Sequence, residues 1–246
     1  MNKKHLNYLM VILLVFTFSA SKAQNGYQPG YAILNDGTRI SGSIILYDDA
    51  PWHNQRFIFL KDSAQLAVNP KTKAKKYKAD DLKFYQVGTR AFDKVHFVDL
   101  ENLQLKSLGT NDHMLERLAT GRIKAHRFYS YEADTEGFAG TEEEFIEWKK
   151  KRTNALFTGF KILITKDNEG KAKNAFDTDL QPYFEDTPEV LAKYKGGGYG
   201  NEPIVVKKGL AAKMMAMAKK AAFKPQLAEA YVNAFNDYND KNKGKN

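Results

Sequence analysis

Short runs in which apolar and polar side chains alternate recur along the first half of the chain. The first such run extends from Ile40 to Leu46 and follows the turn-forming segment Asn35–Gly37. Alternation with a period of two is typical of a strand with one buried face, and Gly42 inside the run indicates a bulge or a close approach by another backbone. Together with the apolar residues before the turn, this run predicts a β-hairpin.

Four further segments have the composition of strands, and they span residues 56–62, 75–78, 83–87 and 91–100. Short strands at this spacing, separated by turn residues, predict a small antiparallel barrel or sandwich. A strand over 123–131 is expected to pair with the apolar run 160–164. Just before that pair, the apolar spacing over 112–121 predicts a short helix with Asp112 as its N-cap and Gly121 at its end.

The second half of the chain has helical patterns. Thr141 and Glu144 have the spacing of a capping box, so we expect a surface helix over 141–152, inserted between two paired strands. From residue 177 onwards the apolar period is helical, with segments at 186–196, 206–223 and 225–238 and a shorter one at 179–186. The predicted fold class is therefore α+β, with a β-rich domain over 24–176, a helical C-terminal region over 177–238 and a mobile tail over 239–246.

The N-terminus has the three parts of a secretory signal. Lys3 and Lys4 precede a short apolar run, and small residues before Gln24 suit signal peptidase, so we expect residues 1–23 to be a signal peptide cut after Ala23. A membrane anchor is the alternative, but the apolar run is about half of the roughly 20 residues that a spanning helix needs. No later segment is apolar enough to span, so the mature chain is expected to be exported, to the periplasm or the extracellular space.

The amino-acid composition limits the classes of function that the chain can have. The chain contains no cysteine, so the exported fold is expected to depend on burial and hydrogen bonding, and thiol catalysis is excluded. The net charge is +9, of which three positive charges lie in the signal, leaving +6 on the mature chain. Because the lysines are spread along the chain instead of forming a stripe, we expect a solvated surface and no nucleic-acid partner.

Several motifs occur together in one order. They are "GYAILNDGTRISGSI", a tryptophan-containing loop before "RFIFLKD", "YKADDLKFYQVG", "MLERLATGRIKAHRFYSY", and the block from "LQPYFEDTPEVLAKYK" to "AFNDYN". In this order they resemble an uncharacterised family of exported envelope proteins common in Bacteroidota, which begin with a "GYI" β module. The resemblance implies a β-rich N-terminal half, helices at the C-terminal end and an envelope location, and it implies no reaction. The helix over 141–152 and the glycines 196–198 depart from the family pattern.

The residues that could carry chemistry do not form a recognisable constellation. The histidines His53, His96, His113 and His126 are widely spaced, so no zinc site is expected. No loop keeps the spacing of a calcium-binding EF-hand, no serine lies in a Gly-x-Ser-x-Gly elbow, and the glycine run lacks the lysine of a phosphate-binding loop. No catalytic, cofactor-binding or metal-binding residue is therefore assigned. The adjacent carboxylates 48–49 and 80–81 leave one enzymatic alternative, a hydrolase of envelope glycan or peptide.

Two features favour binding over catalysis. Trp52 lies in a turn-rich loop, where we expect it to be exposed and to anchor a partner. In the segment 206–223, Met214 and Met217 share one face with Leu210, and this face suits packing on the rest of the protein, a partner groove or a membrane surface. The leading prediction is a non-catalytic module that binds a protein, peptide or glycan, with Trp52, Met214 and Met217 as partner contacts.

The predicted cleavage position is directly testable. N-terminal sequencing and intact mass of the protein recovered from the cell envelope are expected to place the mature N-terminus at Gln24. Replacing the small residue before the cut with a large one, Ala23→Trp, is expected to leave residues 1–23 attached. An unprocessed wild-type chain that begins at Met1 would contradict the prediction.

Overall fold

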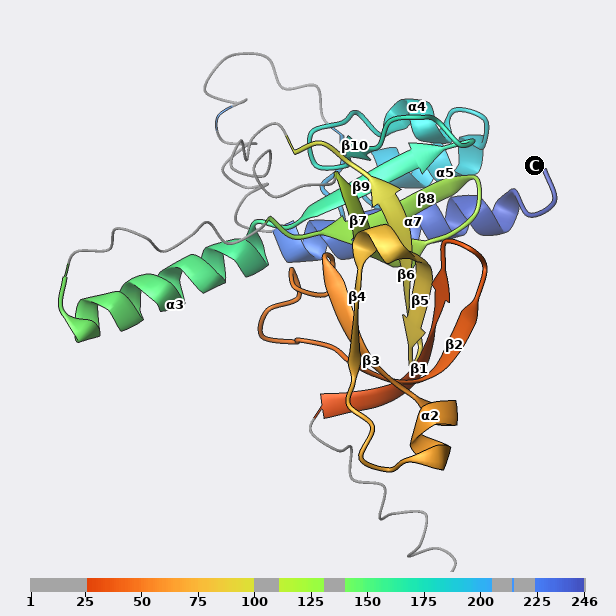
Figure 1. Cartoon of the computed structure of the whole chain (residues 1–246). Coiled ribbons are helices and arrows are strands. Elements are labelled where there is room, and N and C mark those ends of the chain that lie inside the picture. Colours follow the sequence, from red (N-terminus) through yellow and green to blue (C-terminus); the bar gives the residue numbers. More distant parts are fainter. Residues whose placement is uncertain (1–25, 100–110, 131–139, 205–213, 215–223, 246) are drawn as a thin grey trace, which may run out of the picture.

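The described strands form one open antiparallel sheet. A computed structural model describes residues 26–99, 111–130, 140–204, 214 and 224–245. The sheet order is β10-β9-β8-β7-β6-β5-β1-β2-β3-β4, with β4 and β10 at the two edges (Figure 1). The predicted signal peptide, with Ala23 and Gln24, lies outside the described residues, and so do Met217 and most of the predicted helix 206–223.

The strands and helices have the following bounds. The strands are β1 (Tyr27–Leu34), β2 (Arg39–Ile45), β3 (Phe57–Asp62), β4 (Lys75–Lys78), β5 (Leu82–Val87), β6 (Arg90–His96), β7 (Asp112–Ala119), β8 (Ile123–Phe128), β9 (Lys161–Lys166) and β10 (Lys173–Asn174). The helices are α2 (Ser63–Val68), α3 (Glu142–Thr158), α4 (Gln181–Phe184), α5 (Pro188–Lys195) and α7 (Lys224–Lys241), and Ala79–Asp81 forms a 3₁₀ turn.

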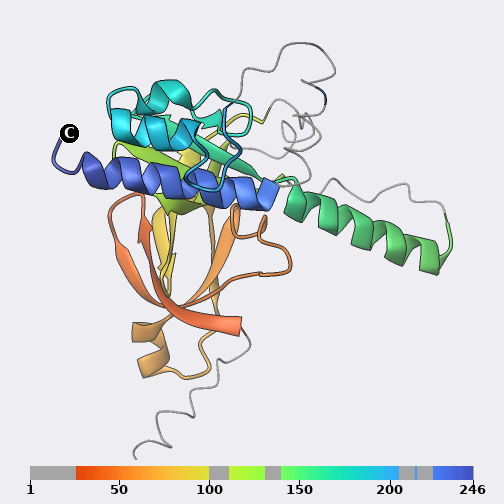
Figure 2. The ribbon, with the colours of Figure 1, turned by 180° about the vertical axis from the view of Figure 1, so that it is seen from behind.

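The prediction of an antiparallel β-rich chain with helices is confirmed, and the barrel is wrong. The strands β1 to β6 curl around a common core, but the sheet order leaves β4 as a free edge, so the sheet does not close. All ten described strands belong to this one sheet, so they do not divide into the two sheets of a sandwich. Figure 2 shows the C-terminal helices α5 and α7 lying across the other end of the sheet.

The short helix predicted over 112–121 is wrong, because this segment is the strand β7 in the interior of the sheet. It pairs with β6 on one side and with β8 on the other. His113, Met114 and Leu115 are all buried, so both faces of the strand are covered at this point. A strand that is buried on both faces loses its alternation, and a run of consecutive apolar residues then resembles a helix.

Two other predicted elements lie where the sequence placed them. The strands β8 and β9 pair in antiparallel register, with Ala125 opposite Ile164. The inserted helix α3 begins after Thr141, whose side chain and that of Glu144 form the predicted capping box, and it continues to Thr158, beyond the predicted end.

The C-terminal helices and the sheet share one hydrophobic core. It contains Ile123 and Ile162 from the sheet, Phe184 and Val190 from the short helices, and Phe235 from α7. No helix in the described part of the chain has the length and apolar character needed to cross a bilayer.

The expected tail begins as ordered helix, because α7 continues to Lys241. The side chain of Asn239 pairs with the main chain of β8: Ile123 N donates to Asn239 Oδ1 at 2.9 Å, and Asn239 Nδ2 donates to Ile123 O at 2.8 Å. Asn242 is also buried, and its Nδ2 donates to Thr187 Oγ1 at 2.8 Å. These contacts fasten the end of α7 to the sheet and to the start of α5.

Gly42 lies in β2 at a point where the neighbouring strand β3 approaches closely, as predicted from the sequence. A Cβ atom at this position would lie 2.0 Å from the main-chain oxygen of Lys61. Such a contact is impossible without moving one strand away from the other, so this position in the hairpin requires glycine.

Gly42→Ala is expected to lower the free energy of unfolding by about 3 kcal/mol, in the range found for overpacked interiors. The neighbouring change Ser41→Ala, at an exposed position of the same strand, is expected to alter stability by less than about 0.5 kcal/mol. Urea unfolding followed by circular dichroism measures both. Equal stabilities of the two variants would contradict the packing argument.

Candidate functional site

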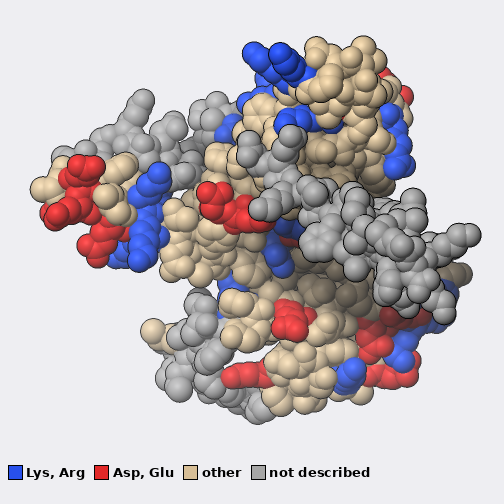
Figure 3. Space-filling view, turned by 90° about the horizontal axis from the view of Figure 1, so that it is seen from below, with Lys and Arg blue, Asp and Glu red and all other residues tan. Residues whose placement is uncertain are grey.

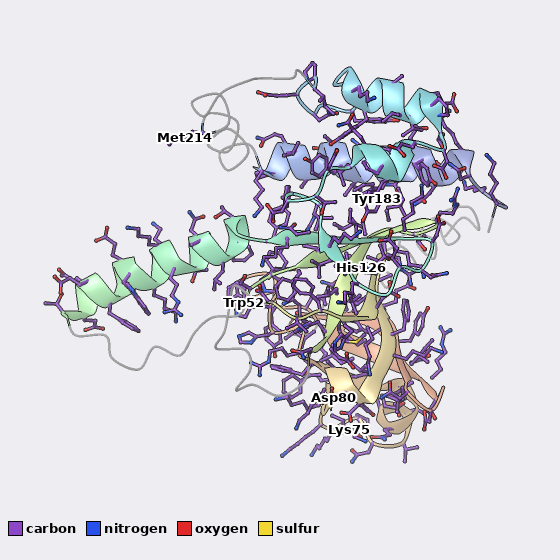
Figure 4. The ribbon with its side chains drawn as sticks, turned by 90° about the horizontal axis from the view of Figure 1, so that it is seen from above. Trp52, Lys75, Asp80, His126, Tyr183 and Met214 are labelled. Atoms are coloured by element: carbon purple, nitrogen blue, oxygen red, sulfur yellow. The ribbon has the colours of Figure 1, made fainter. Side chains whose placement is uncertain are left out.

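Trp52 is buried, contrary to the expectation that it is exposed. Only 4% of its surface is accessible. It packs in a cluster with Leu115, Phe128 and Leu163, and its ring centroid lies 5.6 Å from that of Phe157 (Figure 4). Its role is therefore to join the β2–β3 loop to the strands β7 to β9, and it is not available as an exposed anchor.

The β2–β3 loop folds over the sheet because its polar side chains replace missing main-chain partners. Asn54 Oδ1 accepts a hydrogen bond from Tyr47 N at 2.7 Å, and Asn54 Nδ2 donates to Ile45 O at 3.0 Å. Gln55, which is 3% exposed, bonds to both main-chain groups of Tyr129: Nε2 donates to the oxygen at 2.8 Å, and Oε1 accepts from the nitrogen at 2.6 Å. Sequence reasoning saw only a turn-rich loop here.

The other predicted partner contacts are not brought together. Met214 is 63% exposed and stands apart from Trp52 (Figure 4), and Met217 lies outside the described residues. A partner-binding role for these methionines stays a prediction.

The adjacent carboxylates do not meet in a pocket. Asp48, Asp49, Asp80 and Asp81 are all exposed. Asp81 Oδ2 accepts a hydrogen bond from Lys78 N at 2.9 Å, which caps the 3₁₀ turn. Among the described residues, no three His, Asp or Glu side chains are grouped so that they could hold a metal ion.

A cleft that sequence reasoning missed lies between the sheet, the end of α3 and the start of α7. Its volume is about 450 Å³, which falls in the range of ligand-binding pockets. The described residues that line it are mainly apolar, with two charged members: Leu118, Arg127, Tyr129, Phe157, Phe160, Pro225, Ala228, Glu229 and Val232.

Arg127 is one of the two charged groups of the cleft wall, and the protein satisfies its guanidinium only in part. Its Nη1 lies 3.5 Å from Glu116 Oε2, a weak contact, and its Cζ lies 5.5 Å from the centre of the Phe160 ring. Its Nε is buried and has no hydrogen-bond acceptor among the described residues. A buried N–H without an acceptor costs about 1–3 kcal/mol. The Arg127 side chain as a whole is 33% exposed, so its outer donors can reach a ligand oxygen in the cleft.

Glu116 contacts Arg127 and, more closely, a second arginine. Arg90 Nε donates to Glu116 Oε1 at 2.7 Å, and Arg90 Nη1 lies 3.4 Å from Asp48 Oδ1. Burial alone lowers the pKa of Arg90, but its hydrogen bond to Glu116 and the negative charges of Glu116 and Asp48 together outweigh burial and raise the pKa above the ordinary value. Glu116 therefore pairs more closely with Arg90 than with Arg127, so its carboxylate is shared between two guanidinium groups.

The cleft adjoins a second, small cavity under the β2–β3 loop. This cavity has a volume of about 20 Å³, enough for one water molecule, and shares Arg127 and Tyr129 with the cleft. Asn54 and Gln55 also line it. The loop that holds Trp52 therefore forms the floor behind the charged end of the cleft.

A second charged cluster lies on the opposite face of the sheet. Arg117 donates to both oxygens of Asp93, at 2.7 and 2.5 Å, and His126 Nε2 lies 2.9 Å from Asp93 Oδ2 (His126 is labelled in Figure 4). Burial by itself raises the pKa of Asp93, but the hydrogen bonds from His126 and Arg117 outweigh it and hold the pKa well below the ordinary range. The three groups satisfy one another, which is the arrangement of a structural ion pair.

The helix α3 is the most extended feature of the surface. None of its side chains is buried, and the helix projects away from the body of the protein (Figure 1). Figure 3 shows acidic side chains at its outer end and basic side chains nearer the body. The acidic residues are Glu142, Glu143, Glu144 and Glu147, and the basic residues are Lys149, Lys150, Lys151 and Arg152.

The edge strand β4 is poorly suited to accept an added strand from a partner. Three of its four residues, Lys75, Lys76 and Lys78, are exposed lysines. Lys76 Nζ lies 4.0 Å from the centre of the Phe57 ring on β3, so its charge covers an aromatic side chain beside the edge. Lysines on an edge oppose strand addition, so the cleft is a better binding site than this edge.

Comparison with protein-family models, curated proteins and solved structures finds no match to this chain.

Asp93→Asn is expected to lower the free energy of unfolding by about 2 kcal/mol at pH 7, because Arg117 and His126 lose a charged acceptor. The folded-state pKa of Asp93 is depressed, so its stabilisation is present above the unfolded pKa of about 3.9 and is lost as pH falls below that value. The difference between wild type and Asp93→Asn should therefore shrink between about pH 4 and pH 2. Urea unfolding at several pH values measures it, with the exposed Asp49→Asn as the control.

Proposed function

We propose that the protein is an exported component of the cell envelope, in the periplasm or outside the cell, and that it binds a partner without transforming it. The cleft around Arg127 carries this proposal, because it combines an apolar wall with a guanidinium that is only partly satisfied by the protein. Export rests on the signal pattern of residues 1–23, and membership of the Bacteroidota envelope family rests on the motif order described above.

Among protein, peptide and glycan partners, the cleft favours a polypeptide segment that carries an apolar side chain next to a carboxylate. Phe157, Phe160 and Val232 provide an apolar surface, and Arg127 provides donors for a carboxylate. A glycan needs a hydrogen-bonding partner for most of its hydroxyl groups, and the described lining offers few such groups. A carboxylate is found at the C-terminus of every polypeptide and on Asp and Glu side chains.

The alternative, a hydrolase of envelope glycan or peptide, has less support. Its proposed carboxylates, Asp48–Asp49 and Asp80–Asp81, are exposed, and of these four only Asp48 lines the small cavity. Neither proposed pair therefore faces a shared pocket, as a catalytic pair is expected to do. Glu116 faces the small cavity, but it is held by Arg90 at 2.7 Å. This arrangement favours electrostatic balance in the cleft wall over acid–base chemistry.

The proposal is tested by photo-crosslinking in cells. A photoreactive amino acid in place of Val232, in the cleft wall, is expected to give a defined adduct with a polypeptide. Arg127→Ala should weaken binding roughly 10- to 100-fold, because a hydrogen bond to a charged group contributes about 1.5–3 kcal/mol. The adduct should fall accordingly, whereas Arg127→Lys, which keeps the charge, should retain part of it.

Two controls make the result specific. Arg39→Ala removes an arginine that stacks on Tyr31 at 3.6 Å and does not line the cleft, so it should leave the adduct unchanged. The same photoreactive residue in place of Val68, which is 87% exposed on α2, should not give the adduct. An adduct that forms equally well with Arg127→Ala would rule out binding through the cleft.

A further inference from the structure

The helix α3 projects from the described part of the protein (Figure 1), and within that part only its C-terminal end, at Leu156 and Phe157, packs against a core cluster. It has 17 residues and no buried side chain, and at 1.5 Å per residue it is about 25 Å long. Figures 1 and 2 show that it points away from the sheet and from the C-terminal helices. Isolated helices of about 12–15 residues are marginal in water, and most helices in proteins gain their stability by packing an apolar face.

The helix has a well-formed start, which is insufficient by itself. Glu144 Oε2 accepts a hydrogen bond from Thr141 N at 2.8 Å, and Thr141 Oγ1 accepts one from Glu144 N at 3.3 Å. A cap of this kind contributes about 1 kcal/mol. A contact along the length of the helix would stabilise it further, and its surface indicates which contact that is.

One face of α3 has charges that are complementary to themselves. Ile146 is 60% exposed and lies at the centre of this face. Glu142 and Lys149, seven residues apart, lie on one flank of Ile146, and Glu143 and Lys150, also seven residues apart, lie on the other flank, because seven residues are close to two helical turns. Among the described residues, none of these four charged side chains forms an ion pair.

We infer that α3 is a self-association helix, which pairs in antiparallel orientation with α3 of a second copy of this chain. A two-fold axis at Ile146 places the two isoleucines in contact. On one flank Glu142 then faces Lys149 of the partner subunit, and on the other Glu143 faces Lys150 of the partner subunit. A two-fold axis repeats each contact, so four opposite-charge pairs surround one apolar contact.

The described part of the protein does not obstruct this pairing. The body is attached at the C-terminal end of α3, and Thr158 lies twelve residues beyond Ile146, or about 18 Å along the helix. In an antiparallel pair the two bodies therefore lie at opposite ends and on opposite sides of the contact. Figure 2 shows the outer part of α3 clear of the described strands and helices.

The dimer is expected to be weak and sensitive to salt. The overlap is confined to the first half of each helix, so the interface lies below the roughly 1,200 Å² of a standard stable complex. Exposed charge pairs are screened when the Debye length falls to about 3 Å at 1 M salt. The average mass should therefore increase with protein concentration at low salt, and this increase should be lost at 1 M salt.

The test uses two charge-reversal variants of the full protein and sedimentation analysis. In the variant Glu142→Lys/Glu143→Lys all four positions become basic, and in Lys149→Glu/Lys150→Glu all four become acidic. Each variant alone brings like charges together at every contact, so each should remain monomeric where the wild type associates. An equimolar mixture of the two variants restores all four opposite-charge pairs and should form a heterodimer at least as readily as the wild type dimerises.

The mixture separates pairing from loss of the helix. Lysines in the first turn oppose the helix dipole, so Glu142→Lys/Glu143→Lys is expected to fray α3 to some extent. A frayed helix would not associate with the other variant, so recovery in the mixture requires the proposed contact. A wild type that stays monomeric at about 1 mM and low salt would overturn the inference, and so would a mixture that fails to associate or variants that self-associate like the wild type.

Discussion

One buried glutamine bonds to the main chain of two distant segments and thereby joins two separate parts of the sheet. Gln55 comes from the loop between β2 and β3, and three strands separate β2 from β7 in the sheet. Its side chain bonds to both main-chain groups of Tyr129, and its main-chain oxygen accepts a hydrogen bond from Met114 N at 2.8 Å. The loop therefore satisfies main-chain groups beside the sheet that a neighbouring strand would otherwise satisfy. If the Gln55 side chain stayed buried without these partners, both of its hydrogen bonds to Tyr129 would be lost and its polar atoms would be left unsatisfied.

Because Gln55 joins the β2–β3 loop to the middle of the sheet, the charged end of the cleft lies between two apolar cores. On one side, the curled strands β1 to β6 enclose a core that contains Tyr85 and Phe92, and Tyr85 Oη donates to Asn54 O at 3.1 Å under the loop. On the other side, the C-terminal helices pack on β8 and β9. Arg127 lies on the face of β8 that continues from one core to the other, so its charge is close to apolar surface and is worth more to an anionic ligand than in open solvent.

The elements that the sequence predicted well are those with local signals. The hairpin strands, the close approach at Gly42 and the capping box at Thr141 each depend on a few neighbouring residues. The strand β7 was mistaken for a helix because burial on both faces removed its alternation, which is a property of its neighbours in the sheet. Whether the sheet closes into a barrel and whether the end of α7 is ordered likewise depend on contacts between distant segments. The contact between Asn239 and Ile123 is an example.

The candidate site was harder to predict than the fold. Trp52 was expected to be exposed because turn-rich loops usually are, and the bonding of Gln55 that buries this loop has no sequence signature. The sequence of β8 contains one signal of the site. In β8 the residues that face the helices are Ile123, Ala125 and then Arg127, so a charged residue interrupts an apolar row. Such an interruption indicates either an internal ion pair or a binding site, and here the weak contact with Glu116 favours the second.

The two borders of the sheet also affect how the protein behaves in a crowded compartment. A ten-stranded open sheet would ordinarily offer two rows of unpaired amides to neighbouring molecules, which is the route to fibrils. Here one border carries the repelling charges of Lys75, Lys76 and Lys78, and the other, β10, is only two residues long. A chain without disulfides, which unfolds and refolds without a covalent restraint, is thereby protected from templated aggregation at high local density.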